Sequence, residues 1–360
     1  MKNPYDGRPD YQFWRRSLPG RAATAVDPVT HVPFTISKTA SVATAGSCFA
    51  QHIARHLSGM GFNYFVPEDR VTHEFCQDEN YGTFSARYGN IYTVRQLWQL
   101  MLRAYGLYAP KHKFWVRDDG RLMDPFRPRI QSSGFATLDH LLIDQASHLE
   151  AVRRVFEESD VFIFTLGLTE AWVADADGAV VPLAPGTVSS VDQEASYSFR
   201  NFSVFEMVED LSQFIKNLRK VNSGCSVILT VSPVALVATY EDEHVLVANT
   251  YSKSALRVVA EIVAGKFAAV SYFPSYEMIT GPQARAQFFA DDLREIRPEG
   301  VAYVMSVFGK HYLRNTSLES GATSVASPGT DESLPASAEF YAEIEGVICD
   351  EEQIVVNIST

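Results

Sequence analysis

Apolar residues along the chain fall into short unbroken runs that are separated by longer stretches with helical spacing. The short runs are typical of buried strands in a parallel sheet, and they occupy residues 42–45, 62–66, 160–166, 226–231 and 270–274. The helical stretches begin near residue 49 and then cover 93–105, 205–221, 251–267 and 298–312. Strands that alternate with helices predict an α/β fold with right-handed connections between parallel strands.

A long segment, residues 67–136, separates the second predicted strand from the third. It is rich in aromatic residues and arginine, and only residues 93–105 within it have a clear helical pattern. Insertions at the loop edge of an α/β sheet commonly form lids or substrate walls. Two interpretations therefore stay open: the aromatic side chains pack a largely helical cap, or some of them line a pocket for a carbohydrate or acyl group.

Charge divides the 360-residue chain into unequal parts. All 31 basic residues precede residue 315, whereas nine of the 43 acidic residues follow it. We predict an N-terminal arm (1–38), a main domain (39–314), a flexible linker (315–338) rich in small and polar residues, and an acidic C-terminal hairpin (339–360). A nearly neutral body with an acidic tail argues against a nucleic-acid partner. The tail suits either contact between copies in a homo-oligomer or the covering of a sheet edge.

Composition excludes several further classes. No apolar run approaches the ~20 residues of a membrane-spanning helix, and the N-terminus lacks the apolar region of a secretory signal, so we expect a cytoplasmic protein. The four cysteines, Cys48, Cys76, Cys225 and Cys349, have no metal-ligand spacing and are expected to be free thiols. We expect neither a metal nor another cofactor.

The candidate chemistry centres on Gly46-Ser47, a turn between the first predicted strand and the first helix. A serine there has an exposed hydroxyl at the carboxyl edge of the sheet, near a helix N-terminus that favours developing negative charge. Serine is also among the commonest N-cap residues. The local pattern alone leaves both a nucleophile and a simple helix cap open.

Residues 46–50, Gly-Ser-Cys-Phe-Ala, match the motif that gives the GSCFA family its name, and that family belongs to the SGNH/GDSL hydrolase-like group. Further blocks resemble the same family in the same order: 84–92, 166–172, 231–234, 250–254, 272–276 and 289–294. The resemblance covers roughly residues 10–312. It implies a flavodoxin-like three-layer α/β/α sandwich.

The resemblance also implies roles for individual residues. SGNH proteins stabilise an oxyanion with the backbone N–H of the serine, a glycine N–H and an asparagine side chain. Ser47 matches the first position, and Gly89 with Asn90, in the turn that begins at Tyr88, best matches the second, although an ordinary β-turn is the alternative there. At the third position the chain has Thr169 and Glu170 in place of the usual Asn-Asp, and Thr169 retains a hydroxyl donor.

The catalytic base departs from the SGNH pattern. The usual Asp-x-x-His before the last helix reads Asp292-x-x-Glu295, so a complete Ser-His-Asp triad is not implied. A carboxylate acts as a base only if burial raises its pKa, and neighbouring arginines oppose this. His244, after the strand at 226–231, is an alternative base, and Lys253 is a candidate partner for the substrate.

His52 and His56 lie four residues apart on one helix face, yet no third metal ligand accompanies them. Three hypotheses therefore remain for the protein. The first is an SGNH-like serine esterase or O-acyltransferase acting on acyl or acetyl esters, including those of carbohydrates. The second is a catalytically inactive protein that binds a carbohydrate or acyl group on the same fold, and the third is a scaffold or interaction protein.

Overall fold

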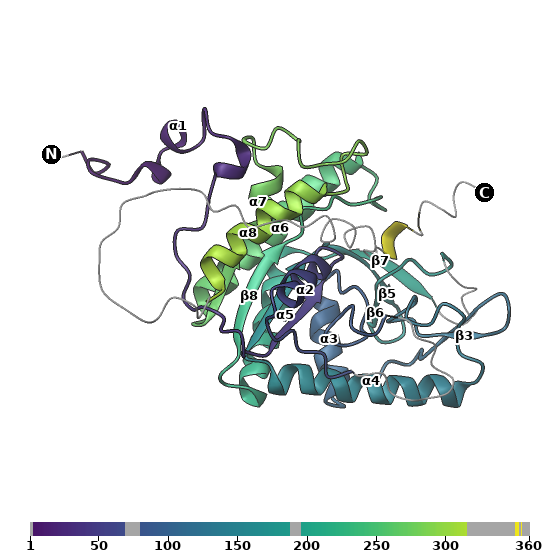
Figure 1. The fold of residues 1–360 in the computed structure, drawn as a ribbon. Helices are drawn as coiled ribbons and strands as arrows, with labels where there is room; N and C mark the ends of the chain where they lie inside the picture. The colour runs from purple at the N-terminus through teal and green to yellow at the C-terminus, as the bar shows by residue number, and fades with distance from the viewer. Residues whose placement is uncertain (1–2, 69–79, 188–195, 315–349, 353, 355–360) are drawn as a thin grey trace.

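The computed structural model describes residues 3–68, 80–187, 196–314, 350–352 and 354. Its centre is a four-stranded parallel sheet with the order β1-β4-β8-β9 (Figure 1). The strands are β1 (Val42–Gly46), β4 (Val161–Leu166), β8 (Ser226–Val231) and β9 (Val270–Phe273). Four of the five predicted strands are thereby confirmed.

The predicted second strand, 62–66, is reduced to one parallel bridge between Tyr64 and Val42. The amide of Val42 donates to the carbonyl of Asn63, and that of Phe65 donates to the carbonyl of Val42. Pro67 then follows, and a proline has no N–H with which to extend the pairing. The bridge lies on the edge of β1 away from β4, so the order of segments is that of a flavodoxin-like sheet.

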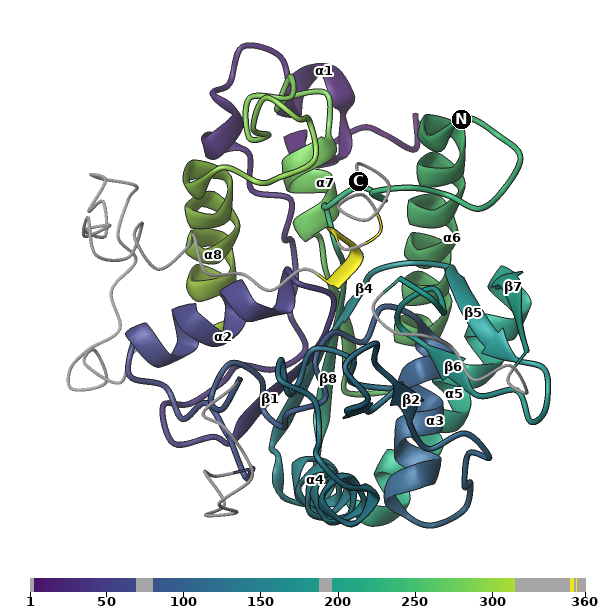
Figure 2. The ribbon, with the colours of Figure 1, turned by 90° about the vertical axis from the view of Figure 1, so that its right-hand side faces the viewer.

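Helices cover both faces of the sheet and complete a three-layer α/β/α arrangement. Figure 2 shows α2 (Ala50–Gly59) and α8 (Pro298–Tyr312) on one side, and α5 (Val204–Val221) and α6 (Val245–Lys266) on the other. The central strand explains why both faces need cover. Phe162 and Phe164 of β4 pack in the core with α5 and α6, whereas Ile163 packs in the core with α2 and α8.

The part of the insertion that the structure describes contains one helix, α3 (Val94–Ala104), as the sequence predicts. Thr93 caps it, because the Thr93 side chain accepts from the amide of Gln96 while the Gln96 side chain accepts from that of Thr93. A hairpin follows, formed by β2 (Trp115–Val116) and β3 (Leu122–Met123). The long helix α4 (Leu138–Glu158) then leads into β4.

A second, antiparallel sheet has the order β6-β5-β7 and was not predicted. Its strands are β5 (Glu170–Ala174), β6 (Val180–Val181) and β7 (Tyr197–Asn201). The remaining helical elements are η1 (Asp10–Gln12), α1 (Trp14–Ser17), η2 (Ala23–Ala25), α7 (Ser275–Thr280) and η5 (Asp350–Glu352). Among the described residues, no helix combines the length and hydropathy that crossing a bilayer requires.

The predicted linker, 315–338, lies outside the described residues, as does most of the predicted hairpin, 339–360. From that C-terminal region the structure describes η5, drawn in yellow in Figures 1 and 2. Cys48 and Cys225 are buried and form no disulfide among the described residues, whereas Cys76 and Cys349 lie outside the described residues. The boundaries proposed for the arm, domain and tail stay predictions.

Candidate active site

The end of β1 lies in unusually close contact with β4. Gly46 has φ +136°, and a Cβ at this position would lie 2.3 Å from the carbonyl oxygen of Thr165. Only glycine fits such a backbone. The amide of the next residue, Ser47, donates to the same Thr165 carbonyl at 3.1 Å. This amide, which the family resemblance assigns to an oxyanion, is therefore engaged in the sheet.

The side chain of Ser47 is only 3 % exposed. Its Oγ has no hydrogen-bond partner among the described residues. The N-cap of α2 is Phe49, and no side chain caps that helix. The alternative that Ser47 serves as a helix cap is therefore wrong, and its buried hydroxyl needs another explanation.

Three loop segments meet at Ser47. The amide of Ile91 donates to the carbonyl of Gly46 at 2.8 Å, and the amide of Gly167 donates to the carbonyl of Tyr92 at 3.1 Å. A Cβ at Gly167 would lie 3.0 Å from the Cβ of Ser47. The loops after β1 and β4 thus enclose residues 91–92 at the point where strand order reverses, which is where flavodoxin-like sheets bind ligands.

The turn at residues 88–90, which the family resemblance assigns to an oxyanion loop, directly precedes Ile91, whose amide bonds to Gly46. Asn90 is 2 % exposed, and its Oδ1 accepts from Gln51 Nε2, on the first turn of α2, at 3.5 Å. Gly89 has φ +67° with open space around it. Tyr88 is hydrogen-bonded to β1: its hydroxyl donates to the carbonyl of Thr44.

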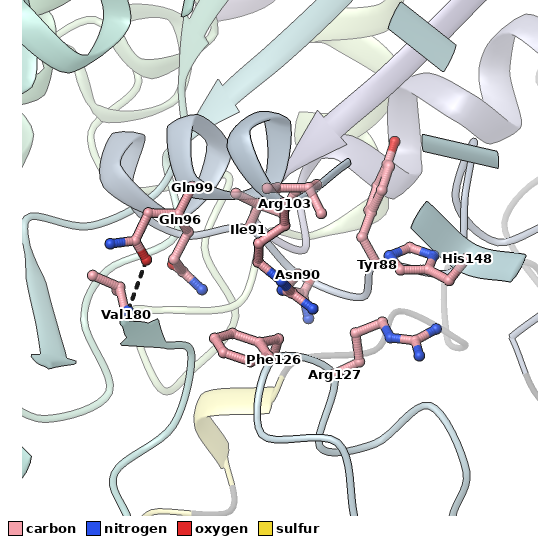
Figure 3. Close-up of a pocket in the computed structure, with 11 residues that line it drawn as sticks. Tyr88, Asn90, Ile91, Gln96, Gln99, Arg103, Phe126, Arg127, His148 and Val180 are labelled. Carbon is pink, nitrogen blue, oxygen red and sulfur yellow. Dashed lines mark hydrogen bonds between the residues drawn. The ribbon is translucent and has the colours of Figure 1, made fainter. Parts of the chain in front are cut away.

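Two adjoining cavities, one larger than the other, lie next to this turn. Figure 3 shows Tyr88, Asn90 and Phe126 around the larger one. The same three residues also line the smaller cavity. Aromatic side chains of the insertion therefore do border the space beside Asn90, although the identity of any sugar or acyl ligand stays a prediction.

The segment after β4 supplies a second buried hydroxyl and a buried cation. Thr169 is fully buried, and its Oγ1 has no hydrogen-bond partner among the described residues. Lys253, on α6, is 1 % exposed and donates from Nζ to the carbonyl of Gly167 at 2.8 Å. Glu170 accepts from Thr239 Oγ1 at 2.7 Å, and burial raises its pKa. Thr169 and Lys253 thus belong to the Ser47 region, whereas Glu170 holds the loop after β8.

Neither Asp292 nor Glu295 hydrogen-bonds to Ser47, and both are exposed. Asp292 Oδ1 accepts from the amides of Arg294 and Glu295 at 3.0 and 3.1 Å, which closes a tight turn. Glu295 therefore lacks the desolvation that a carboxylate base needs. Arg294 points inward instead: its Nε donates to the carbonyl of Ala235 at 3.1 Å, and its side chain is only 13 % exposed.

His244 is also engaged away from Ser47. It is the N-cap of α6, and its Nδ1 accepts from the amide of Leu246 at 3.1 Å. The helix begins six residues earlier than the pattern of apolar residues indicates, because this histidine, in place of the expected Ser or Thr, supplies the cap. The proposed role of His244 as a substitute base has no support from its placement.

A histidine that sequence reasoning missed lies on α4, the helix that follows the insertion. His148 on α4 is 1 % exposed, and its Nδ1 is 2.8 Å from Glu68 Oε2. Its Nε2 has no partner among the described residues, and the ring lines the larger cavity together with Asn90. Tyr88 packs edge-on against this ring, with the centroids 6.3 Å apart, and connects it to β1. His148 belongs to none of the family blocks, so its position beside Tyr88 and Asn90 had no signal in the sequence.

Among the described residues, His52 and His56 belong to no cluster of three potential metal ligands. Burial lowers the pKa of His52 and of His56 to about 4. Their folded-state pKa values lie below the unfolded value of 6.5, so the unfolded chain binds more protons between these limits. Each histidine therefore contributes stability that is lost as pH falls from about 6.5 toward 4.

We expect His56→Gln to flatten this pH dependence. The fall of the His56 pKa from 6.5 to about 4 corresponds to a change of about 3 kcal/mol at most in the free energy of unfolding. Urea unfolding of the wild type and the variant at pH 7 and pH 4.5 measures the difference, and His31→Gln, at an exposed histidine, is the control. An equal loss of stability in wild type and His56→Gln at pH 4.5 would contradict the prediction.

The fold and the site together define an α/β protein with a buried serine at the carboxyl edge of a flavodoxin-like sheet, and in the described part of the chain its hydroxyl has no hydrogen-bond partner. The sequence model of the GSCFA family matches residues 41–308, which include every strand of the central sheet and nearly all of α8. The chain belongs to the GSCFA family. A search of curated proteins finds no match to it.

Proposed function

We propose that the protein is an SGNH-like serine hydrolase or O-acyltransferase that acts on acyl or acetyl esters, including those of carbohydrates. The observation that carries this proposal is the Ser47 hydroxyl, which is buried at the β1–β4 switch point without a hydrogen-bond partner among the described residues. Burying an unsatisfied hydroxyl costs about 1–3 kcal/mol. A functional role accounts for this cost.

In the proposed reaction, Ser47 Oγ attacks the acyl carbon of the ester and forms a tetrahedral oxyanion. The amide group of Asn90 and the hydroxyl of Thr169 are the donors that the site offers to this oxyanion. Collapse of the intermediate breaks the bond to the alkoxide, which leaves as the alcohol with the proton of the Ser47 hydroxyl, and an acyl group stays on Ser47. Water then takes the acyl group in a hydrolase, and a second alcohol takes it in a transferase.

A second function is a protein that binds the same ligands without catalysis. The exposed position of Glu295 and the helix-cap role of His244 favour it, because neither residue is placed to take the proton of Ser47. An activated serine and an inert one differ in reactivity toward electrophiles. This difference separates the two functions directly.

A fluorophosphonate probe makes the test. We expect the wild type to be labelled, mass spectrometry of the digest to place the label on Ser47, and Ser47→Ala to abolish the labelling. Acid-denatured protein is the control for non-specific reaction. A native protein that acquires no label at Ser47 would favour the binding function and rule out the hydrolase.

A further inference from the structure

The acidic segment η5 (Asp350–Glu352) lies against the candidate active site, although more than 250 residues separate it from Asn90 in the sequence. Figure 2 draws it in yellow at the top of the central sheet, beside β4. Asp350 and Glu351 are only 4 % and 6 % exposed. Buried carboxylates are costly unless they are paired, so the surroundings of this segment must offer donors and positive charge.

Asp350 contacts the turn that the proposed reaction uses for its oxyanion. Its Oδ2 accepts from Asn90 Nδ2 at 2.9 Å, and its backbone amide donates to the hydroxyl of Tyr92 at 3.0 Å. Arg129 Nε lies 3.9 Å from Oδ1. Asp350 also lines the smaller cavity, together with Gly89 and Asn90. A carboxylate oxygen thus occupies the acceptor position of the proposed oxyanion donor.

Glu351 contacts the basic residues on the other side of the site. Its Oε2 lies 3.3 Å from Arg294 Nη2. Burial raises the pKa of the Glu351 carboxyl, and the charges of Arg294 and Lys253 act against that rise. Lys253 is itself bonded to Gly167, the residue that touches Ser47. The same end of the sheet therefore combines a nucleophile, an amide donor and two basic residues. Asn90 and Arg294 each contact a carboxylate of the segment, and the charge of Lys253 acts on Glu351.

A site that holds two neighbouring carboxylates has the chemistry to hold an anionic ligand. We propose that the active site takes an ester whose acyl or alcohol part carries a carboxylate, with Arg294 and Lys253 binding that group. In the structure the carboxylates of Asp350 and Glu351 occupy this anion site, so they compete with the ligand for it. The inference deepens the proposed function and rests on it for the ester chemistry, whereas the anion site itself rests on the contacts of Arg294 and Asn90 with the two carboxylates.

The binding test uses full-length protein and a fluorescein-labelled synthetic peptide with the sequence of residues 346–356. A tethered segment competes at an effective concentration of about 1 mM, so the wild type is expected to bind the peptide weakly. The double variant Asp350→Ala/Glu351→Ala is expected to bind it at least tenfold more tightly by fluorescence polarisation. Glutarate, a small dicarboxylate, is expected to displace it.

Matched variants make the outcome decisive. Asp331→Ala/Glu332→Ala removes the same charge from the same tail and is expected to leave peptide binding at the wild-type level. Adding Arg294→Gln to the Asp350/Glu351 variant is expected to abolish the gain, and Arg294→Lys to restore part of it. Equal peptide affinity for wild type and the Asp350/Glu351 variant, or binding that ignores Arg294→Gln, would overturn the proposal.

Fluorophosphonate labelling separates this proposal from the proposed function. If the segment competes, Asp350→Ala/Glu351→Ala is expected to label at Ser47 several-fold faster than the wild type. Slower labelling would make Glu351 part of the reaction and overturn its role as a competitor. If neither protein labels, the hydrolase fails, and the peptide titration still decides whether the anion site exists.

Discussion

Replacing Ser47 by alanine is expected to reduce the hydrolysis of p-nitrophenyl acetate by about 10³-fold or more, since loss of a nucleophile removes the whole covalent pathway. The initial rate at equal enzyme concentration and saturating substrate, followed by absorbance, measures the effect. The substitution removes one buried hydroxyl that has no partner among the described residues, so the fold is expected to tolerate it.

Ser232→Ala is the matched control for this experiment. Ser232 is also buried and also follows the carboxyl end of a central strand, β8, but its Oγ accepts from the amide of Val234 at 3.3 Å. Its substitution is expected to change the rate less than about threefold while costing up to about 1–3 kcal/mol of stability. Comparable rates for Ser47→Ala and the wild type would show that the activity resides elsewhere.

Replacing Asp144 by alanine is expected to lower the free energy of unfolding by about 3–5 kcal/mol, since it leaves two buried cations without their shared carboxylate. Asp144, on α4, lies 2.9 Å from Arg87 Nη1 and 2.5 Å from Arg127 Nη2. All three side chains are at most 4 % exposed. Urea denaturation monitored by circular dichroism measures the loss.

Glu158→Ala provides the control on the same helix. Glu158 pairs with Arg154 at 2.8 Å, but both side chains are 46 % exposed, so its loss is expected to cost less than about 1 kcal/mol. If the two substitutions lower the free energy of unfolding equally, the buried ion pairs of Asp144 do not stabilise the protein more than an exposed pair does.

The Asp144 cluster also gives a pH signature. Although burial raises the pKa of Asp144, the charges of Arg127 and Arg87 lower it to about 2, from 3.8. A depressed pKa means that the carboxylate contributes stability above pH 3.8, and that this contribution is lost as pH falls through about 2. Acid titration of wild type and variant is expected to show the curves converging below pH 2.

The predictable part of the fold is the part whose burial is uniform. Val161–Leu166 and Ser226–Val231 are buried on both faces, so their apolar runs are unbroken and their type is plain. The edge segment at Tyr64 was predicted as a strand from its apolar residues, but among the described residues it pairs with β1 through a single bridge only. The antiparallel sheet of β5 to β7 was missed because its strands are short and only partly buried.

Residues of the candidate site were predictable where a strand end places them. Ser47 and Thr169 follow neighbouring strands, and Lys253 reaches the same edge through Gly167. Glu295 was misplaced because Asp292 closes a turn that directs Arg294 inward, a local choice that residue spacing does not encode. The contact between Asn90 and Asp350 joins segments 260 positions apart, and such pairing leaves no trace in a single sequence.

The glycine of the family motif has a meaning separate from that of its serine. Gly46 is fixed by the carbonyl of Thr165 on the neighbouring strand and by its φ of +136°, neither of which involves an ester. A related protein that keeps the pairing of β1 with β4 is therefore expected to keep this glycine, whether or not it has a catalytic serine. No comparable backbone constraint acts on Ser47. Its side chain can therefore change without disturbing the β1–β4 pair, whereas that of Gly46 cannot.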